Sequence, residues 1–417
     1  MGLLSDVSPD IIASIACYLR VSSVLNLAAT SKAMRFLISD SHLWEEFCVR
    51  DFRIKAYSFP RSAEGWLELY KNMESPVVLT WGQNRNGRLR HTGWDDIVTP
   101  TQIDTTPFGS ISAMSCSGYG MHALNQKGEV WFWGMLDDNN EETTGSKIAL
   151  PEPARSISSG RTFGCALADS GAAYTWTAAR SFRGIFDTRI TSCTPSKPQY
   201  PWDKQAKAKS IVAGWSHVAM LLADGSIKTC HIDRINTILD LEPFHLSTDP
   251  SDPIIRLAAG DHFTVALSKR GSVYLWREVG CAPASSPKLD ADDELDLRGQ
   301  TFTHVSACLH NLSLFDSTSG LLRAFDMNRR RETTSQWMAN THNIATITTG
   351  DWHAGALLTN GEVWTWGNGS CALGLGRNGQ VEVHEPERIQ SGLDGLFVFD
   401  IAFGGWHSAA LAFRVNN

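Results

Sequence analysis

One repeated unit runs along most of this chain and limits the folds it can adopt. Gly160 and Gly171 bracket a step of 11 residues, with an Ala-Leu pair inside it and an aromatic segment after the second glycine. The same step recurs at Gly214–Gly225, Gly260–Gly271 and Gly350–Gly361. With weaker copies included, repeats start near residues 117, 160, 214, 260, 309, 350 and 404. A period of this length indicates a repeat architecture, in which each unit packs on its neighbours.

Each unit has the pattern of a β-hairpin. The second glycine follows a polar pair such as Ala223-Asp224, as in a hairpin turn that needs positive φ. Aromatic side chains then alternate, as in Val363-Trp364-Thr365-Trp366, so every second residue faces one side of a sheet. The interval between starts varies from 41 residues (309 to 350) to 54 residues (160 to 214), which is typical of loops between fixed strands.

The two ends of the repeat region complete each other. The last copy starts at Gly404 and stops at Phe413, before its second half. That half is present at the other end, where Trp81-Gly82 matches Trp366-Gly367. We therefore expect residues 77–90 and 404–413 to form one blade, because closing the ring removes exposed sheet edges. Residues 77–417 are predicted to form a seven-bladed β-propeller.

Residues 1–48 have helical periodicity instead. Pro9 follows a serine and precedes an aspartate, which favours a helix start there. Apolar residues then recur at helical spacing, at Ile12, Ile15, Ala16 and Leu19. Ser22-Ser23 and Ser31 are candidate caps of a second and a third helix. A helical unit this small is marginal by itself and needs a partner or the neighbouring domain. One interpretation is a helical cap that packs on its own propeller.

Residues 49–76 are predicted to be a stiff helical connector. The segment has few glycines, unlike a flexible linker. Ser62 is a candidate cap for a helix whose apolar residues, again at helical spacing, are Trp66, Leu69, Tyr70 and Met73. We expect this stripe to pack between the first module and the propeller and to hold them at a fixed angle.

Composition excludes several classes of function. The net charge is −7, so nucleic acid is not expected as a partner. No apolar run is long enough to span a bilayer, so no membrane association is expected. The 9 cysteines are never spaced C-x-x-C, which disfavours a cysteine metal site and favours a reducing compartment, cytoplasmic or nuclear.

No catalytic constellation stands out either. There is no G-x-S-x-G segment, and no serine or cysteine is singled out beside a histidine. His217, His353 and His407 each lie three residues after a repeat glycine, and this recurrence favours blade packing over metal binding. We therefore expect a chain that is not an enzyme and that needs no cofactor and no metal.

Two resemblances sharpen this interpretation. The order Pro9-Asp10-Ile11-Ile12, Val24-Leu25-Asn26-Leu27, Thr30-Ser31-Lys32 and Leu43-Trp44 resembles an F-box. The unit Gly…Ala-Leu…Gly-x-Val-Trp-x-Trp-Gly resembles the repeats of the regulator of chromosome condensation, over residues 77–413. The resemblance implies an α+β multidomain fold, with a small all-α F-box followed by an all-β seven-bladed propeller. This layout is similar to that of fungal SCF-associated substrate receptors.

The F-box resemblance implies a non-catalytic adaptor of a ubiquitin ligase. Its F-box would dock on the Skp adaptor, and through it on a cullin, while the propeller binds a protein substrate for ubiquitination and proteasomal degradation. Carried over by position, the Skp-binding residues would be Pro9, Ile12, Ile15, Leu19, Leu27 and Trp44. For substrate binding, the basic run Arg329, Arg330 and Arg331 is a candidate, because guanidinium groups grip carboxylates or phosphates. Its alternative is a solvated loop.

Two other classes of function are left open by the sequence. The propeller alone is compatible with a guanine-nucleotide exchange factor for a Ran-like GTPase, although the chain has no basic tail. An F-box protein can also act as a scaffold outside any ligase, in which case it would bind Skp but not cullin.

Overall fold

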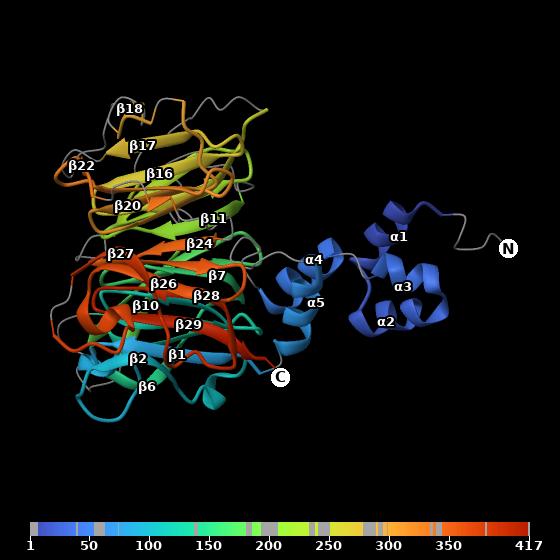
Figure 1. Ribbon diagram of the computed structural model, residues 1–417, viewed down its shortest axis with the longest axis horizontal. Coiled ribbons are helices and arrows are strands. Elements are labelled where there is room, and N and C mark those ends of the chain that lie inside the picture. Colours follow the sequence, from blue (N-terminus) through green and yellow to red (C-terminus); the bar gives the residue numbers. More distant parts are fainter. Residues whose placement is uncertain are drawn as a thin grey trace.

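The computed structural model shows a helical module beside a ring of β-sheets (Figure 1). The predicted architecture is confirmed: a short helical region is followed by a seven-bladed propeller. The structure describes residues 7–38, 41–53, 63–73, 75–136, 141–180, 186–192, 207–232, 238–240, 251–277, 289–290, 295–297, 299–333, 337–338, 344–379 and 382–415.

In the described part of the chain before β1 there are five α-helices. They are α1 (Pro9–Ala16), α2 (Val21–Thr30), α3 (Lys32–Ile38), α4 (Ser41–Phe52) and α5 (Ala63–Asn72). Helix α2 begins right after Arg20, whose extended backbone forms the N-cap, so the predicted cap at Ser22-Ser23 is wrong. Ser31 does cap α3, because its Oγ accepts a hydrogen bond from the Met34 amide at 3.1 Å. The predicted cap Ser62 lies outside the described residues. None of the described helices is both long and apolar enough to cross a membrane.

The helical module has a small core of its own. Val24, Met34 and Ile38 are buried between α2 and α3. The indole of Trp44, from α4, donates a hydrogen bond to the Ile38 carbonyl at 2.7 Å and packs edge-on against the ring of Tyr70. This single side chain therefore ties α3, α4 and α5 together.

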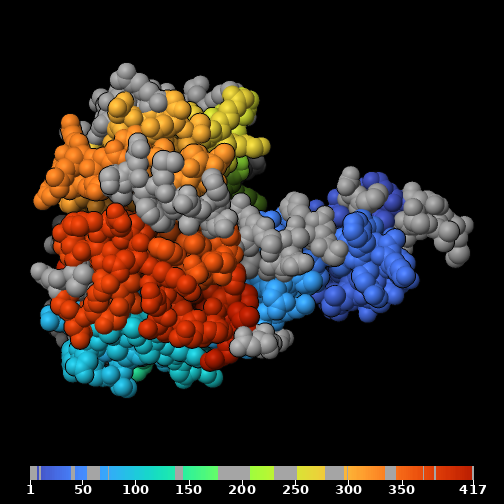
Figure 2. Space-filling model, in the orientation of Figure 1, coloured from blue at the N-terminus to red at the C-terminus, as the bar shows by residue number. Residues whose placement is uncertain are grey.

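Helix α5 joins the module to the propeller. Trp66, Leu69 and Met73 are fully buried, and they belong to one apolar cluster that continues into the sheets as far as Phe413. Burying a side chain of this size stabilises the folded state by about 1.5–3 kcal/mol. The stripe therefore packs as its spacing indicates, and the helices project from one side of the propeller (Figure 2).

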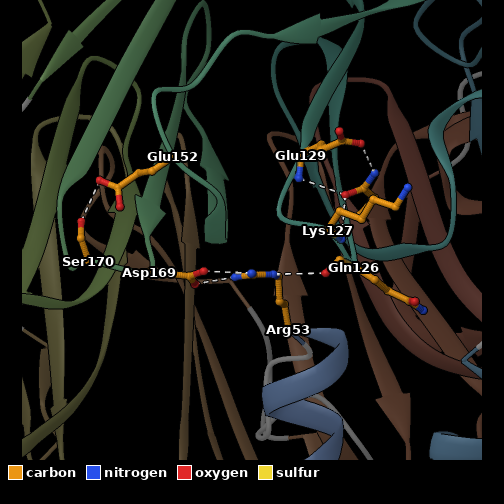
Figure 3. A network of polar contacts seen from close by, with 8 residues as sticks. Arg53, Gln126, Lys127, Glu129, Glu152, Asp169 and Ser170 are labelled. Carbon is orange, nitrogen blue, oxygen red and sulfur yellow. Dashed lines mark hydrogen bonds and ion pairs between the residues drawn. The ribbon is translucent and has the colours of Figure 1, made fainter.

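A polar contact reinforces this joint at the end of α4 (Figure 3). Arg53 has a left-handed backbone, with φ 58°. Its guanidinium donates two hydrogen bonds to the Asp169 carboxylate, at 2.5 and 2.9 Å, and one to the Gln126 carbonyl at 3.3 Å. The Gln126 side chain in turn donates to the carbonyl of Met73, just after α5, at 2.5 Å. Two propeller turns thus hold the ends of both helices.

The propeller consists of seven antiparallel sheets. In chain order the first three are β3 (Ile111–Cys116), β4 (Tyr119–Asn125), β5 (Val130–Met135), β6 (Glu141–Ile148); β7 (Ala154–Ser159), β8 (Gly164–Ala168), β9 (Ala173–Arg180), β10 (Phe186–Ser192); β11 (Ala208–Ala213), β12 (His217–Leu222), β13 (Ile227–Ile232), β14 (Ile238–Asp240). The next three are β15 (Ile254–Ala259), β16 (Phe263–Ser268), β17 (Val273–Arg277), β18 (Leu289–Asp290); β19 (His304–Cys308), β20 (Asn311–Asp316), β21 (Leu321–Asp326), β22 (Arg331–Glu332), β23 (Trp337–Met338); β24 (Ile344–Thr349), β25 (His353–Leu358), β26 (Val363–Asn368), β27 (Glu382–Arg388).

The seventh sheet contains both ends of the repeat region. Its strands are β28 (Leu396–Phe403), β29 (His407–Arg414), β1 (Val77–Gly82) and β2 (Ile97–Gln102). Strands β1 and β29 pair without a bulge, from Val77 opposite Ala412 to Gly82 opposite His407. The first strands of the seven blades contact each other in ring order, and β28 returns to β3. The ring is closed.

Buried histidines join neighbouring blades. The Trp176 indole donates to His122 Nε2 at 3.0 Å, so the proton of this neutral imidazole is on Nδ1, which donates to Ser159 Oγ at 2.9 Å. His353 Nε2 lies 2.8 Å from Ser408 Oγ, and His407 Nε2 donates to the Gly120 carbonyl at 3.0 Å. His217 makes the same kind of contact, to Thr264 Oγ1 at 2.9 Å. The predicted packing role of His217, His353 and His407 is confirmed.

Acid should destabilise the propeller through these histidines. Burial lowers the pKa of His122 and of His353 to about 3, against 6.5 for the free side chain. Below pH 6.5 these histidines bind protons in the unfolded chain but stay neutral in the folded chain. Their contribution to stability is therefore present at neutral pH and is lost as the pH falls. At pH 5 each of these two histidines is expected to cost about 2 kcal/mol relative to pH 7. Urea unfolding at both pH values measures the loss.

A matched pair of variants isolates this effect. In His353→Gln the loss between pH 7 and pH 5 should be smaller by about 2 kcal/mol than in the native chain. His384→Gln is the control, because that imidazole is exposed in the folded chain. Equal losses in all three proteins would contradict the assignment.

The contact between Arg53 and Asp169 can be tested with a double-mutant cycle. Arg53→Ala, Asp169→Ala and the double variant should give a coupling free energy of about 1 kcal/mol in urea unfolding, since the Asp169 side chain is 48% exposed and solvent screens the pair. A coupling of zero would mean that the pair does not hold the helical module to the propeller.

Candidate functional site

The helical module exposes an unusual number of large apolar side chains. Ile11 and Ile15 lie one turn apart on α1, both more than half exposed, and Tyr18 follows one turn later at 90% exposure. Leu25 on α2 and Phe36 on α3 are exposed as well. Helices α1 to α3 form the end of the module that lies away from the propeller (Figure 1). We call Ile11, Ile15, Tyr18, Leu25 and Phe36 the apolar patch.

The structure separates the residues predicted to face the Skp adaptor. Ile12 and Trp44 are 4% and 3% exposed and belong to the core of the module. Leu19 and Leu27 are half-buried against that core. Ile15 is exposed and belongs to the apolar patch. Pro9 is the first residue of α1. A docking role therefore remains a prediction for these residues, and for Ile12 and Trp44 it would be indirect, by shaping the module.

The propeller has two unlike faces. Arg53 contacts Gln126 and Asp169, which lie in turns between the second and third strands of their blades. In an antiparallel sheet, consecutive turns lie at opposite ends of the strands. The loops between first and second strands therefore lie on the other side, away from the helices. We call this side the far face.

A ring of side chains surrounds the centre of the far face. Each blade contributes one residue, which lies in the loop after its first strand or directly beside that loop. Each of these residues carries an aromatic ring or a guanidinium. We call them the rim: Tyr119, Arg161, Trp215, His262, His310, Trp352 and Trp406. These are mostly residue types that dominate protein–protein interfaces.

Backbone contacts between blades fix the rim in place. The Gly118 amide donates to the Arg161 carbonyl at 3.0 Å, and the Trp215 amide donates to the Gly260 carbonyl at 3.0 Å. On the other side of the ring the Asp351 amide donates to the Gly404 carbonyl at 3.1 Å. The loops are therefore held by the propeller itself, as a preformed binding surface requires.

The Trp-Gly dipeptides of the repeats also support the rim. Gly82, with φ 116°, lies so close to the Trp406 carbonyl that a Cβ would stand 2.4 Å from its oxygen. Gly367, with φ 105°, approaches the Trp352 carbonyl in the same way, with a Cβ distance of 2.7 Å. Only glycine fits at these positions, because any side chain would displace a rim loop.

Within the rim, the Arg161 guanidinium contacts two aromatic rings. Its guanidinium carbon is 4.1 Å from the Trp215 ring centre and 4.8 Å from that of Tyr119, and it donates a hydrogen bond to the Tyr119 hydroxyl. It also reaches the sixth blade, where its Nη1 is 4.0 Å from an Asp351 oxygen. Burial raises the pKa of Asp351, and the Cys308 thiol donates to this carboxylate at 3.1 Å.

Below the rim is the central channel, with a volume of about 360 Å³. Its wall consists of the seven first strands, and hydroxyl side chains such as Ser210, Ser306 and Thr348 line it together with Cys116 and Cys308. Within the part of the chain that the structure describes, no three His, Cys, Asp or Glu side chains gather into a possible metal site.

The predicted substrate residues lie beside the rim. Arg329 and Arg330 are in the turn between β21 and β22, and Arg331 begins β22; all three are exposed. The turn contacts the rim, because the Met327 amide donates to the His310 carbonyl at 2.7 Å. Substrate binding by these three arginines remains a prediction.

Sequence reasoning missed the rim itself. Its residues fall one or two positions after a repeat start, as Arg161 and Trp215 follow Gly160 and Gly214, while the noted histidines are one or two positions further on. The signal was the recurrence of bulky aromatic or arginine side chains at that position, where a loop needs none for packing.

Comparisons with known families agree with this architecture. The F-box-like family matches residues 9–50. The regulator of chromosome condensation (RCC1) repeat matches residues 360–411, and a second form of it matches residues 344–372.

Curated relatives match parts of the chain. The F-box protein pof9 of Schizosaccharomyces pombe is 25% identical over 40% of this chain and 36% of its own length. The ultraviolet-B receptor UVR8 of Arabidopsis thaliana is 24% identical, over 48% of each chain. Human E3 ubiquitin-protein ligase HERC2 is 24% identical over 79% of this chain but only 6% of its own length. The chain thus spans about a third to a half of the length of pof9 and UVR8.

Solved structures show the same propeller. Prp20p of Saccharomyces cerevisiae, described together with its binding to Gsp1p and histones, superposes with a TM-score of 0.64 at 18% identity, over 86% of this chain and 96% of its own. Human WBSCR16 gives 0.62 at 15% identity, over 82% and 99%. At this identity the likeness establishes the fold. The chain therefore carries an F-box-like domain followed by a propeller of RCC1 repeats.

Proposed function

We propose that this chain is the substrate-recognition subunit of an SCF (Skp–cullin–F-box) ubiquitin ligase. Its F-box-like domain docks on a Skp-type adaptor, and its propeller binds a target protein for ubiquitination. The chain itself is a non-catalytic adaptor, and ubiquitin transfer takes place elsewhere in the complex. The observation that carries the proposal is the apolar patch on the F-box-like domain.

The side chains of the apolar patch lie outside the core of the helical module. They are at least half exposed, whereas the core of the same domain already buries Val24, Ile38 and Trp44. Five exposed large apolar side chains on one small domain are available to a protein partner. Covering a side chain such as Phe36 by a partner removes apolar area from water and supplies binding free energy.

The contact between the helical module and the propeller also fits a role in a ligase. A ligase must present its target at a fixed position, and the shared core around Leu69 and Met73, together with the Arg53–Asp169 contact, restricts the angle between the two domains. The far face, with its rim, points away from the F-box-like domain and is free to receive a target.

The docking proposal is tested with exposed residues of the patch. Ile15→Asp and Phe36→Asp should each weaken binding of a purified Skp-type adaptor at least about 10-fold, which is 1.4 kcal/mol, because a charge would be buried at the interface. Isothermal titration calorimetry measures the affinity. Both residues are exposed, so circular dichroism should be unchanged.

Two control variants make the result interpretable. Trp94→Asp introduces the same charge at an exposed apolar residue of the propeller and should leave adaptor binding unchanged. Trp44→Ala removes a buried indole and should lose about 3–5 kcal/mol of stability, so its loss of binding would report unfolding. Native affinity in both patch variants, or no adaptor binding by the native chain, would sink the proposal.

A further inference from the structure

We propose that the rim of the far face is the target-docking surface and that it takes an acidic segment, in which an aspartate or glutamate side chain binds Arg161. The inference rests on the proposed function, since it names the chemistry of the target that the propeller receives.

The Arg161 guanidinium has N–H groups that are not used in the hydrogen bonds of the described residues. A guanidinium carries five N–H groups. Among the described residues the Arg161 side chain makes one hydrogen bond, to the Tyr119 hydroxyl, and one ion pair at 4.0 Å, to Asp351. Its side chain is 30% exposed at the mouth of the channel. The remaining N–H groups are available to a carboxylate, which accepts two of them side by side.

Stacking prepares Arg161 for this role. The rings of Tyr119 and Trp215 hold the guanidinium plane, so little conformational entropy is lost when a ligand binds. Arg161 already covers the Tyr119 and Trp215 rings, so these two rings are not open to a cation of the ligand.

The rest of the rim adds apolar contact. The indoles of Trp352 and Trp406 stack with their ring centres 5.6 Å apart, and Trp352 is 46% exposed. Exposed tryptophan beside arginine is the composition of an interface hot spot. An extended segment that places its carboxylate on Arg161 would lay its neighbouring residues over these rings.

Charge around the rim favours the same partner. The turn before β22 contacts the rim through His310 and contains Arg330, and Arg331 is the first residue of β22. Both are exposed, and the described residues give neither an ion-pair partner. Arg329 is paired with Asp326, at 3.6 Å. These guanidinium groups attract acidic residues that flank the bound carboxylate.

A change at Asp351 distinguishes binding of an acidic segment from binding of a basic segment. Its carboxylate oxygen lies 4.0 Å from Arg161 Nη1, beyond hydrogen-bond distance, and its negative charge repels a ligand carboxylate at the same guanidinium. Asp351→Asn keeps an oxygen that can accept from the Cys308 thiol but removes the charge. If the rim takes acidic segments, this variant binds more tightly; if it takes basic ones, it binds more weakly.

The experiment uses a synthetic peptide array probed with the purified full-length chain. One set of random peptide sequences is printed four times, with glutamate, glutamine, lysine or phosphoserine at the central position. The native chain should prefer the glutamate set to the glutamine set about 10-fold. Arg161→Gln should abolish this preference, Trp352→Ala should weaken binding to the glutamate set, and Asp351→Asn should strengthen it.

Arg270→Gln is the matched control, because this arginine is exposed in a turn on the side of the propeller that carries the helices. It should behave as the native chain does. Binding of the Skp-type adaptor by every variant is measured on the same samples, so that failure of the docking proposal and failure of the rim are told apart.

Three results would overturn the inference. The first is equal binding of the glutamate and glutamine sets, or a preference for lysine. The second is a glutamate preference that survives Arg161→Gln. The third is a phosphoserine set that binds far more tightly than the glutamate set, which would assign the surface to a phosphorylated target instead.

Discussion

The pairing of β1 with β29 is the contact on which the rest of the molecule depends. It joins residues 77–82 to residues 407–412 and closes a ring whose first strands contact each other in chain order. Strand β1 also begins only four residues after Met73, which is buried in the core that α5 shares with the seventh blade. The strand that closes the ring is therefore the strand that anchors the F-box-like domain, and the two ends of the molecule are held at a defined angle.

This geometry separates two surfaces that serve different partners. The apolar patch lies on α1 to α3, at the end of the F-box-like domain away from the propeller, while the rim lies on the far face of the propeller. Both surfaces expose large side chains, since Phe36 is 79% and Trp352 46% exposed. Exposed residues on rigid elements are available for binding.

The fold was predictable because its constraints are local. A turn glycine with positive φ, a Trp-Gly pair and alternating apolar residues recur in sequence, and each is needed wherever a blade forms. The docking surfaces were less predictable. Helical spacing placed Ile12 and Ile15 on one stripe, but how much of that stripe the core covers depends on α2 to α4, so Ile12 is buried and Ile15 is not. The surroundings of Arg161 come from the first, third and sixth blades, and no local pattern reveals that Asp351 lies opposite it.

The central claim is that the adaptor binds at one end of the chain and leaves the far face free. Hydrogen–deuterium exchange of the full chain, with and without a purified Skp-type adaptor, tests it most directly. We predict slower exchange in residues 9–38 and unchanged exchange in the rim loops around Arg161, Trp215 and Trp352. Protection of the rim loops by the adaptor, or no protection of residues 9–38, would contradict the account.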